Sequence, residues 1–365
     1  MRILRNYILK ECVLPFILSL VVLSCVFLLG YTVKLAHLVI NKGVPVIVIG
    51  KIFLLLFPLL LTYTIPFACI IGVIMAFSRL SADNEIIAIR ASGIRLKSLI
   101  TPLLTIGILL SLFTFYLNDR VIPKAHYEQK KLQQNLGLEN PEALLEPGVF
   151  ITEFKGQTLF MHRVEGNRFF NITIWQPQVD GGQTRTIVAK HGEFTKSPDN
   201  KKLILKLKDG TSDETDMENP NNFYKLNFKT LFITLDLSAL SKEVVKKPKS
   251  MTIQELVDEI HRLEPLLRTD DIYPLETELY RRITWSFSPF IFILLGFPLG
   301  IITNRREKSA HVIIAIFCAA VYYLLSLGAQ GLSIEGKFSA GTIMWVPTVV
   351  GLTIAVFLNR KICAS

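Results

Sequence analysis

The chain of 365 residues is 50% hydrophobic, has a mean hydropathy of +0.42, and carries 40 Lys and Arg against 30 Asp and Glu. This composition excludes a purely soluble globular protein. The basic excess lies outside residues 119–282, in apolar stretches and their short connections, which argues against a nucleic-acid-binding surface and favours basic anchors beside a membrane.

Six uncharged apolar stretches are each long enough to cross a membrane, because ~20 residues rising ~1.5 Å each cover ~30 Å of hydrocarbon. Lipid offers the backbone no hydrogen bonds, so each stretch is expected to be a helix. The predicted spans are residues 12–33, 52–78, 98–118, 283–304, 309–334 and 338–359. Prolines inside them are expected to mark kinks, and neighbouring helices can bond the carbonyl groups that the prolines leave free.

The charges of the short connections predict the orientation. Most of their basic residues share one side, which the positive-inside rule places in the cytoplasm together with both termini. A cleaved signal peptide ending near Cys25 is disfavoured, because the apolar run continues to Val33. The predicted organisation is residues 1–118 with three spans, an extracytoplasmic domain at 119–282, and residues 283–365 with three more spans.

The cytoplasmic connection between spans two and three, "SRLSADNEIIAIRASGIRLKSL", predicts a short helix near 81–93. Ser81 is expected to cap this helix and Gly93 to end it. Asp83 and Glu85 are expected in its first turn, where the helix dipole favours acids. A helix with both charged and apolar side chains suits docking into a groove of a cytoplasmic partner, and a solvated loop helix is the alternative.

The extracytoplasmic window changes to short alternating segments separated by turn residues, a pattern typical of an antiparallel β-sandwich or β-jellyroll. The expected strands are Val149–Phe154, Thr158–Val164, Phe169–Trp175, Thr184–Lys190, Lys202–Lys208 and Phe223–Leu237. Several are apolar on both faces, which fits either an ordinary core or an apolar interior open to a lipid. Helical segments are expected on both sides, at 119–134 and, after a capping box of Thr252 and Glu255, at 256–263.

No arrangement of catalytic or metal-binding residues emerges from the sequence. The segment Gly331–Lys337 has the spacing of a phosphate-binding loop, but Phe338 stands where a Ser or Thr hydroxyl should reach magnesium. The five cysteines lie in or beside the spans without a metal-binding pattern, and the histidines lack catalytic surroundings. We therefore expect a chain that is not an enzyme, with no metal and no cofactor of its own.

Three stretches resemble the lipopolysaccharide-export permeases of the LptF/LptG family: "RLSADNEIIAIRASG" in the cytoplasmic connection, "ETELYRRIT" at the entry to span four and "GFPLGIITNRRE" at its exit. The arrangement of three spans, a β domain and three spans matches as well, and "LRNYILKE" near the N-terminus is closer to the LptF side. The resemblance implies a non-catalytic permease subunit in the bacterial inner membrane, with a periplasmic β-jellyroll-like domain. It also implies partners: an LptB-like ATPase dimer that uses ATP and Mg, a paralogous LptG-like or LptF-like permease, LptC- and LptA-like bridge proteins, and lipopolysaccharide.

The resemblance also implies site residues. Glu85 aligns with the acid of the family's coupling helix, so it is expected to contact the ATPase, with Arg90 and Arg95 as weaker candidates. Lipid contact is expected in the β domain at Phe150, Phe160, Phe170, Ile172, Ile174 and Phe232, for which a closed core is the alternative.

The outer end of span one carries Lys34, His37 and Lys42, on a side where basic residues are rare. They are expected to bind lipid phosphates, and a snorkelling lysine beside an incidental histidine is the alternative.

A different functional class stays open at this point. Permeases of the FtsX/MacB type also pair with an ATPase but transmit force and conduct no lipid. Their layout of four spans, with the domain after the first, disagrees with the six spans predicted here. A membrane-embedded enzyme would need polar catalytic residues inside the spans, where His311 and a few Ser, Thr, Asn and Gln are found.

Overall fold

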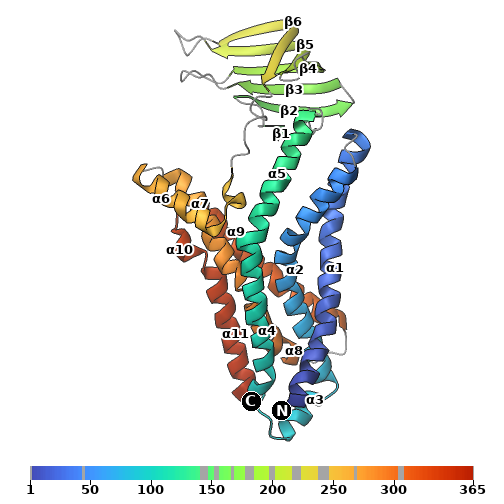
Figure 1. Cartoon of the computed structure of the whole chain (residues 1–365), viewed down its shortest axis with the longest axis vertical. Coiled ribbons are helices and arrows are strands. Elements are labelled where there is room, and N and C mark those ends of the chain that lie inside the picture. The colour runs from blue at the N-terminus through green and yellow to red at the C-terminus, as the bar shows by residue number, and fades with distance from the viewer. Residues whose placement is uncertain are drawn as a thin grey trace. The chain divides into compact units, whose positions relative to one another are not determined.

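The computed structural model describes residues 2–42, 46–139, 147–151, 156–165, 168–176, 185–196, 202–215, 223–236, 246–266, 269–302 and 308–364 (Figure 1). The chain divides into two compact units, each described here by itself. The helical unit comprises Met1–Thr32, Phe53–Tyr127 and Lys246–Ser365. The sheet unit comprises Val33–Ile52 and Glu128–Val245.

Long apolar helices dominate the described chain. In chain order the elements before the sheet are α1 (Arg2–Lys42), α2 (Val46–Ala82), α3 (Glu85–Ala91), α4 (Lys97–Tyr116), the π-helical turn η1 (Leu117–Val121) and α5 (Ile122–Glu139). Those after it are η4 (Pro248–Ser250), α6 (Ile253–Leu263), η5 (Glu264–Leu266), α7 (Thr269–Ser286), α8 (Ser288–Ile302), α9 (Lys308–Ile334), α10 (Ala340–Ile343) and α11 (Val346–Ala364).

Five of the described helices are long and apolar enough to cross a membrane, and a sixth span is formed if the bent pair of α7 and α8 counts as one. The two helices of that pair meet at an angle of 40° beside Phe287. The predicted fold class, a membrane helical protein with an inserted antiparallel β domain, is confirmed.

Prolines inside the spans leave backbone carbonyl groups without their helical partner, four residues earlier in the chain. For Pro66, Pro289 and Pro298 a side chain bonds the freed carbonyl. The three bonds run from Trp285 Nε1 to Thr62 O (3.1 Å), from Ser288 Oγ to Trp285 O (2.6 Å) and from Asn359 Nδ2 to Leu294 O (2.8 Å). Two of these donors come from another helix, so the prolines are accommodated in the way the sequence leads us to expect.

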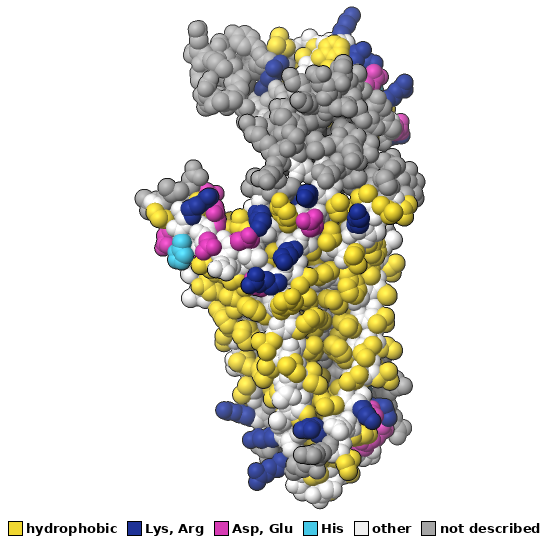
Figure 2. Space-filling model, in the orientation of Figure 1, with side chains coloured by type: hydrophobic (Ala, Val, Ile, Leu, Met, Phe, Trp, Pro, Cys, Tyr) yellow, Lys and Arg dark blue, Asp and Glu magenta, His cyan; other side chains and the backbone are white. Residues whose placement is uncertain are grey.

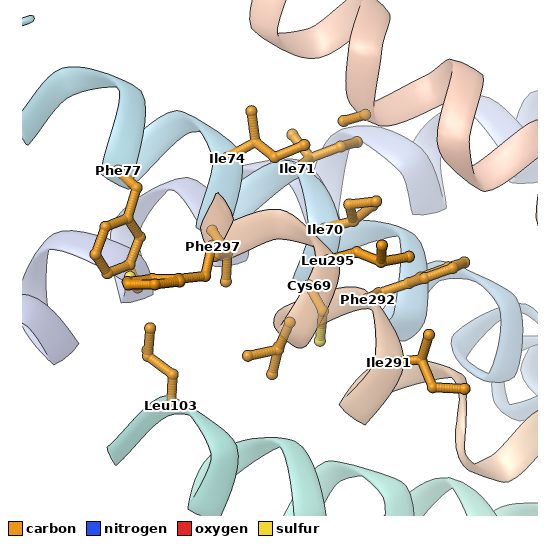
Figure 3. Close-up of a cluster of buried hydrophobic side chains, with 14 of the residues drawn as sticks. Cys69, Ile70, Ile71, Ile74, Phe77, Leu103, Ile291, Phe292, Leu295 and Phe297 are labelled. Atoms are coloured by element: carbon orange, nitrogen blue, oxygen red, sulfur yellow. The ribbon is translucent and has the colours of Figure 1, made fainter. Parts of the chain in front are cut away.

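The core of the helical unit lies where α2, α4 and α8 meet (Figure 3). Phe77 of α2 packs edge-on against Phe297 of α8, with ring centroids 4.8 Å apart. Figure 3 shows these rings and the surrounding side chains, which are Cys69, Ile70, Ile71, Ile74, Leu103, Ile291, Phe292 and Leu295. All are buried, so α8 is enclosed by its neighbours, as an apolar helix without lipid contact would be.

Two glycines of the "GFPLG" segment let α2 and α8 approach closely. A Cβ atom at Gly300 would lie 2.8 Å from Phe77 Cβ and 3.0 Å from Ile74 O, and one at Gly296 would lie 3.1 Å from Val73 Cβ. Small residues four apart on one helix face are the usual device for tight packing between membrane helices. Part of the family-like motif therefore serves helix packing.

The sheet unit holds six antiparallel strands in sequential order, β1-β2-β3-β4-β5-β6. They are β1 (Phe150–Ile151), β2 (Thr158–Glu165), β3 (Arg168–Gln176), β4 (Arg185–Lys196), β5 (Lys202–Thr215) and β6 (Phe223–Asp236). The described strands thus form one sheet, whereas a sandwich has two. Their inward side chains form one apolar cluster: Ile151, Leu159, Met161, Phe169, Ile172, Ile174, Ile187, Ala189, Leu205, Leu207, Ile233 and Leu235.

The alternation of inward and outward residues shifts by one along a single line across the sheet. His162, Asn171, Lys190, Asp209 and Lys229 lie opposite one another on β2 to β6 along this line, and all are exposed. Inward residues on either side are three apart instead of two, as in Met161 and Val164 or Phe169 and Ile172. Asn171 and Asp209 have positive φ angles of 51° and 52°, a conformation that Asn and Asp tolerate best among residues with a side chain.

Candidate functional site

The short cytoplasmic helix predicted from the sequence is present as α3, but it starts later than expected. α2 continues to Ala82, so Ser81 lies in its last turn and donates a hydrogen bond to Ile301 O (3.3 Å) of α8. The expectation that Ser81 caps the short helix is therefore wrong. The residue before α3 is Asn84, which has a left-handed φ of 60° and makes no side-chain cap.

The rest of the prediction for this helix is confirmed in part. Glu85 lies in the first turn of α3, and Gly93, with φ of 77°, follows its end. Asp83, which was expected in the first turn, lies in the preceding turn instead. Glycine is suited to that end because a left-handed conformation costs it nothing sterically.

Side chains of α3 hold it to both ends of the chain. The Tyr7 hydroxyl of α1 lies 3.1 Å and 2.9 Å from the two carboxylate oxygens of Glu85, to which it donates. Arg90 Nη2 donates to Ile362 O (3.0 Å) in the last turn of α11. A carbonyl in that position has no partner within its own helix and lies at the negative end of the helix dipole, so a guanidinium group suits it.

One face of α3 is packed and the other is open. Ile86 is buried in the core of the helical unit, whereas the neighbouring Ile87 is 61% exposed. Arg90 and Arg95 are exposed as well, although the guanidinium of Arg90 has the contact described above. α3 is thus held against the helical unit by one face, and its other face presents an apolar and basic surface to solvent.

The surface of the helical unit has an apolar middle and a basic end (Figure 2). Hydrophobic side chains cover its middle as a broad band, and Lys and Arg side chains gather at the end that carries both termini. The exposed basic residues there include Arg5, Lys10, Arg79, Arg90, Arg95, Lys97, Arg360 and Lys361. A band of this kind is what lipid requires, and the basic end is what the positive-inside rule requires of a cytoplasmic face.

The sheet separates the six predicted lipid-contact residues into two groups. Ile172 and Ile174 belong to the inward cluster and have no exposed surface. Phe150 and Phe232 are more than 60% exposed, and Phe160 and Phe170 are half-buried outside that cluster. The structure therefore does not bring the six together on one face.

The outward phenylalanines lie among aromatic and charged neighbours. Phe150 contacts Phe160 and Trp175, with ring centroids 5.0 Å and 5.6 Å apart. The cations of Arg163 and Lys206 each lie 5.8 Å from a phenylalanine ring centroid, those of Phe170 and Phe232 respectively. The outward face is thus mixed in character, whereas the described inward side chains are apolar apart from Ser212, which lies opposite Ile187.

The remaining candidates at the outer end of span one all fall within α1, which runs on to Lys42. Lys34, His37 and Lys42 thus share one helix, and their spacing places them within less than half of its circumference. Their side chains lie outside the described residues. Within the part of the chain that the structure describes, no three His, Cys, Asp or Glu side chains lie together as a metal site would need.

Sequence reasoning missed the tyrosine that holds Glu85 and the charged pair of Glu278 and Arg282 in the C-terminal half of α7. Both lie in stretches that resemble the family, "LRNYILKE" and "ETELYRRIT". The available signal for the pair was its spacing of four residues, which places a carboxylate and a guanidinium on one helix face.

Comparison of the sequence with known proteins finds one matching family and several relatives. The sequence profile of the family described as lipopolysaccharide export system permease LptF/LptG matches residues 6–361. An uncharacterized protein of Rickettsia prowazekii is 24% identical over 338 residues, which are 89% of this chain and 91% of that protein. The lipopolysaccharide export system permease protein LptF of Escherichia coli is 20% identical over 359 residues, 98% of this chain and 94% of that protein.

Proposed function

The chain belongs to the lipopolysaccharide export system permease LptF/LptG family, and from that premise we propose that it is one permease subunit of an ATP-driven extractor of lipopolysaccharide. The family and the apolar helices make it a multi-pass protein of the inner membrane. In this proposal an LptB-like ATPase dimer binds from the cytoplasm and a paralogous permease pairs with this chain. LptC- and LptA-like proteins receive the lipid, and ATP hydrolysis takes place in the partner.

The observation that carries the proposal is that α3 is bonded to two membrane helices and still has an exposed face. A helix that is to pass force from a cytoplasmic partner must be held by the membrane helices and must still expose a contact surface. Tyr7 and Arg90 connect α3 to α1 and α11, while Ile87 remains exposed. The basic end of the helical unit supports a cytoplasmic location for α3, with both termini on the same side.

Charge reversal of Glu85 tests the coupling role in the complex of the full chain with its partner permease and ATPase. Glu85→Lys should lower ATPase association and lipid-stimulated turnover while the permease still inserts into the membrane. Asp83→Lys is the matched control, because Asp83 is exposed in the adjacent turn. Tyr7→Phe is the second control, since it removes the internal hydrogen bond and leaves the charge of Glu85 in place.

The wild type and these three variants distinguish a direct contact of Glu85 with the ATPase from a role in holding α3 on α1. If Glu85→Lys alone lowers association, Glu85 contacts the ATPase. If Tyr7→Phe lowers it equally, Glu85 acts only by holding α3 on α1. Wild-type coupling in Glu85→Lys refutes the coupling assignment.

We also propose that acyl chains pass along the inward face of the sheet. Each CH₂ group returned to water costs about 0.8 kcal/mol, so an acyl chain needs an apolar surface without interruption. The described inward side chains are apolar apart from Ser212, and because they are buried they must part for an acyl chain to pass. Arg163, Lys206 and the pair of Lys208 and Glu193 interrupt the outward face.

Photocrosslinking distinguishes the two faces. Groups placed at Ile172 and Ile174 should capture lipopolysaccharide in an ATP-dependent way, and groups at Phe150 and Phe232 should capture little. Capture at the outward pair alone would reverse the assignment of faces. Transport with all four positions inert would show that the sheet of this chain carries no lipid.

A further inference from the structure

The C-terminal half of α7 holds a fully buried arginine that bonds one carboxylate and three backbone carbonyl groups. Arg282 is 1% exposed, and its Nε donates to Glu278 Oε1 (2.8 Å). Its Nη1 donates to Met251 O (2.5 Å), and its Nη2 to Pro248 O (3.0 Å) and Lys249 O (3.2 Å). One guanidinium group thus binds the backbone of η4, which is the segment through which the chain returns from the sheet unit.

The partner carboxylate is shared. Glu278 also receives two hydrogen bonds from Arg281, from Nε to Oε2 (2.9 Å) and from Nη2 to Oε1 (2.7 Å). A buried charge requires such pairing, because an unpaired charge in a medium of low dielectric constant destabilises the folded state. Only the rigid fork of an arginine presents donors in several directions at once, so a lysine at position 282 cannot reproduce the contacts with three carbonyl groups.

The segment through which the chain leaves toward the sheet unit is connected to the same place. Asp119, in the π-helical turn η1, accepts a hydrogen bond from Ile253 N (2.9 Å) at the start of α6. Asn118 of the same turn donates to Ser286 Oγ (3.3 Å) of α7. Lys246 lies over the ring of Tyr127, with its Nζ 5.8 Å from the centroid.

These contacts surround two of the four places where the chain passes between the units, the one after Tyr127 and the one before Lys246. A few residues after Arg282, α7 ends and meets α8 in the bend beside Phe287. α8 is in turn bonded to α2 just before α3, since Ser78 Oγ donates to Gly300 O (3.1 Å) and Ser81 Oγ to Ile301 O.

We propose that Arg282 is a positioning residue that makes two chain connections of the sheet unit, those after Tyr127 and before Lys246, follow the tilt of α7, so that movements of the membrane helices reach the sheet during lipid transfer. This inference rests on the proposed transport function. An arginine that merely stabilised the fold would lower every activity together with stability. A positioning residue affects the step that needs the sheet to follow the membrane helices, which is the transfer of loaded lipid.

The test uses the full chain in its complex with the ATPase and the partner permease, reconstituted in lipid with lipopolysaccharide. Arg282→Lys is the variant, and Arg281→Lys is the matched control, because Arg281 bonds the same carboxylate and none of the three carbonyl groups. Three quantities are measured: ATP hydrolysis, lipid bound to the permease, and lipid transferred per ATP. Hydrogen exchange at residues 248–253 is followed in lipid-free samples.

We expect Arg282→Lys to raise exchange at 248–253 and to lower transfer per ATP at least about tenfold, the order of one lost charged hydrogen bond. ATP hydrolysis and lipid loading should stay within about twofold, since neither step needs this contact. Arg281→Lys should behave like the wild type. If Arg282→Lys does not insert, Asp119→Ala removes the second connection and should give the same loss of transfer per ATP.

Unchanged transfer per ATP in Arg282→Lys overturns the proposal, as does an equal loss in Arg281→Lys or a parallel fall of all activities. Failure of the wild-type complex to transfer lipopolysaccharide contradicts the proposed function instead. In that case hydrogen exchange at residues 248–253 still tests the structural part of the proposal: unchanged exchange in Arg282→Lys shows that Arg282 does not hold this segment.

Discussion

The packing of α2 against α8 depends on a glycine that leaves no room for a methyl group, so Gly300→Ala is an informative perturbation. An added Cβ would lie 2.8 Å from Phe77 Cβ and 3.0 Å from Ile74 O. Carbon atoms in favourable contact are about 3.5–4.0 Å apart, and the backbone of α2 fixes the positions of Phe77 Cβ and Ile74 O, so the helices must separate. Their separation also strains the hydrogen bond from Ser78 to Gly300 O.

The expected cost follows from two opposing effects. Overpacking of a well-packed core costs about 1–3 kcal/mol. Alanine gains up to about 1 kcal/mol over glycine in helix propensity. When the full gain is subtracted, the net loss in the free energy of unfolding of this core is about 0–2 kcal/mol. Gly328→Ala in α9 is the matched control, because a Cβ there meets nothing within 4 Å and only the propensity gain remains.

Thiol labelling of Cys69 measures the effect inside the affected core. This cysteine is 2% exposed, so it reacts with a maleimide only when the packing opens. The other four cysteines, Cys12, Cys25, Cys318 and Cys363, are first replaced by Ala so that only Cys69 can be labelled. Gly300→Ala should label Cys69 at a lower temperature than the parent, and Gly328→Ala should not. Identical labelling curves for the two variants would refute the close-approach argument.

Three further predictions concern other parts of the chain. Trp285→Phe removes the donor to Thr62 O and should lower the free energy of unfolding in detergent by about 1–3 kcal/mol, the cost of an unsatisfied buried carbonyl. A loss no larger than that of the control Trp345→Phe, at a half-buried tryptophan, would show that the bond is dispensable. Burial raises the pKa of Glu255, but hydrogen bonds from Lys246 and from the Thr252 backbone outweigh it and hold that pKa below its ordinary value. The stabilisation by Glu255 is thus present above the ordinary carboxyl pKa and is lost as pH falls through the lowered one. Amide protection of α6 should therefore decrease on acidification, and in Glu255→Gln it should be independent of pH over that range. Replacing Lys34 and Lys42 together by Gln should reduce lipid loading more than ATPase assembly, with a deeper loss at higher salt, and unchanged loading would leave both as snorkelling residues.

The spans and most strands could be predicted from the sequence because their signals are local. An uncharged run of ~20 residues has few alternatives to a membrane helix, and an alternating run between turn residues has few alternatives to a strand. The expected strand at 202–208 is contained in β5, and the expected helix at 119–134 is contained in η1 and α5. Element ends were less certain, since β5 continues to Thr215.

The shift in the sheet was missed because strict alternation was assumed along each strand. Asn171 and Asp209 were the local signal, since a polar residue that tolerates positive φ stands in the middle of each strand. Beyond that line every inward position moves by one residue. Assignment of a face from alternation alone therefore placed Phe170 and Ile172 together, although the structure puts them on different sides.

The start of α3 was misplaced for a different reason. Ser81 has the right type and position for a cap, and a local argument stops there. In the structure its hydroxyl finds a carbonyl of α8, 220 positions later in the chain, so α2 continues through it. Sequence patterns carry no information about such a partner. The same holds for Tyr7 and Glu85, which are 78 positions apart.

The contact between Tyr7 and Glu85 changes what a partner arginine must achieve at the coupling helix. A hydrogen bond to a charged group is worth about 1.5–3 kcal/mol when partly buried, whereas an exposed ion pair contributes about 0–1 kcal/mol. An arginine that merely met Glu85 at the surface would therefore not displace the tyrosine. It must either bind the carboxylate together with Tyr7, which is possible because a carboxylate offers about four acceptor sites, or bury the pair by packing over Ile87. Only the second route needs Ile87, which stands two residues after Glu85 and therefore faces another side of α3, so the acid and Ile87 are two separate points of contact in the proposed coupling.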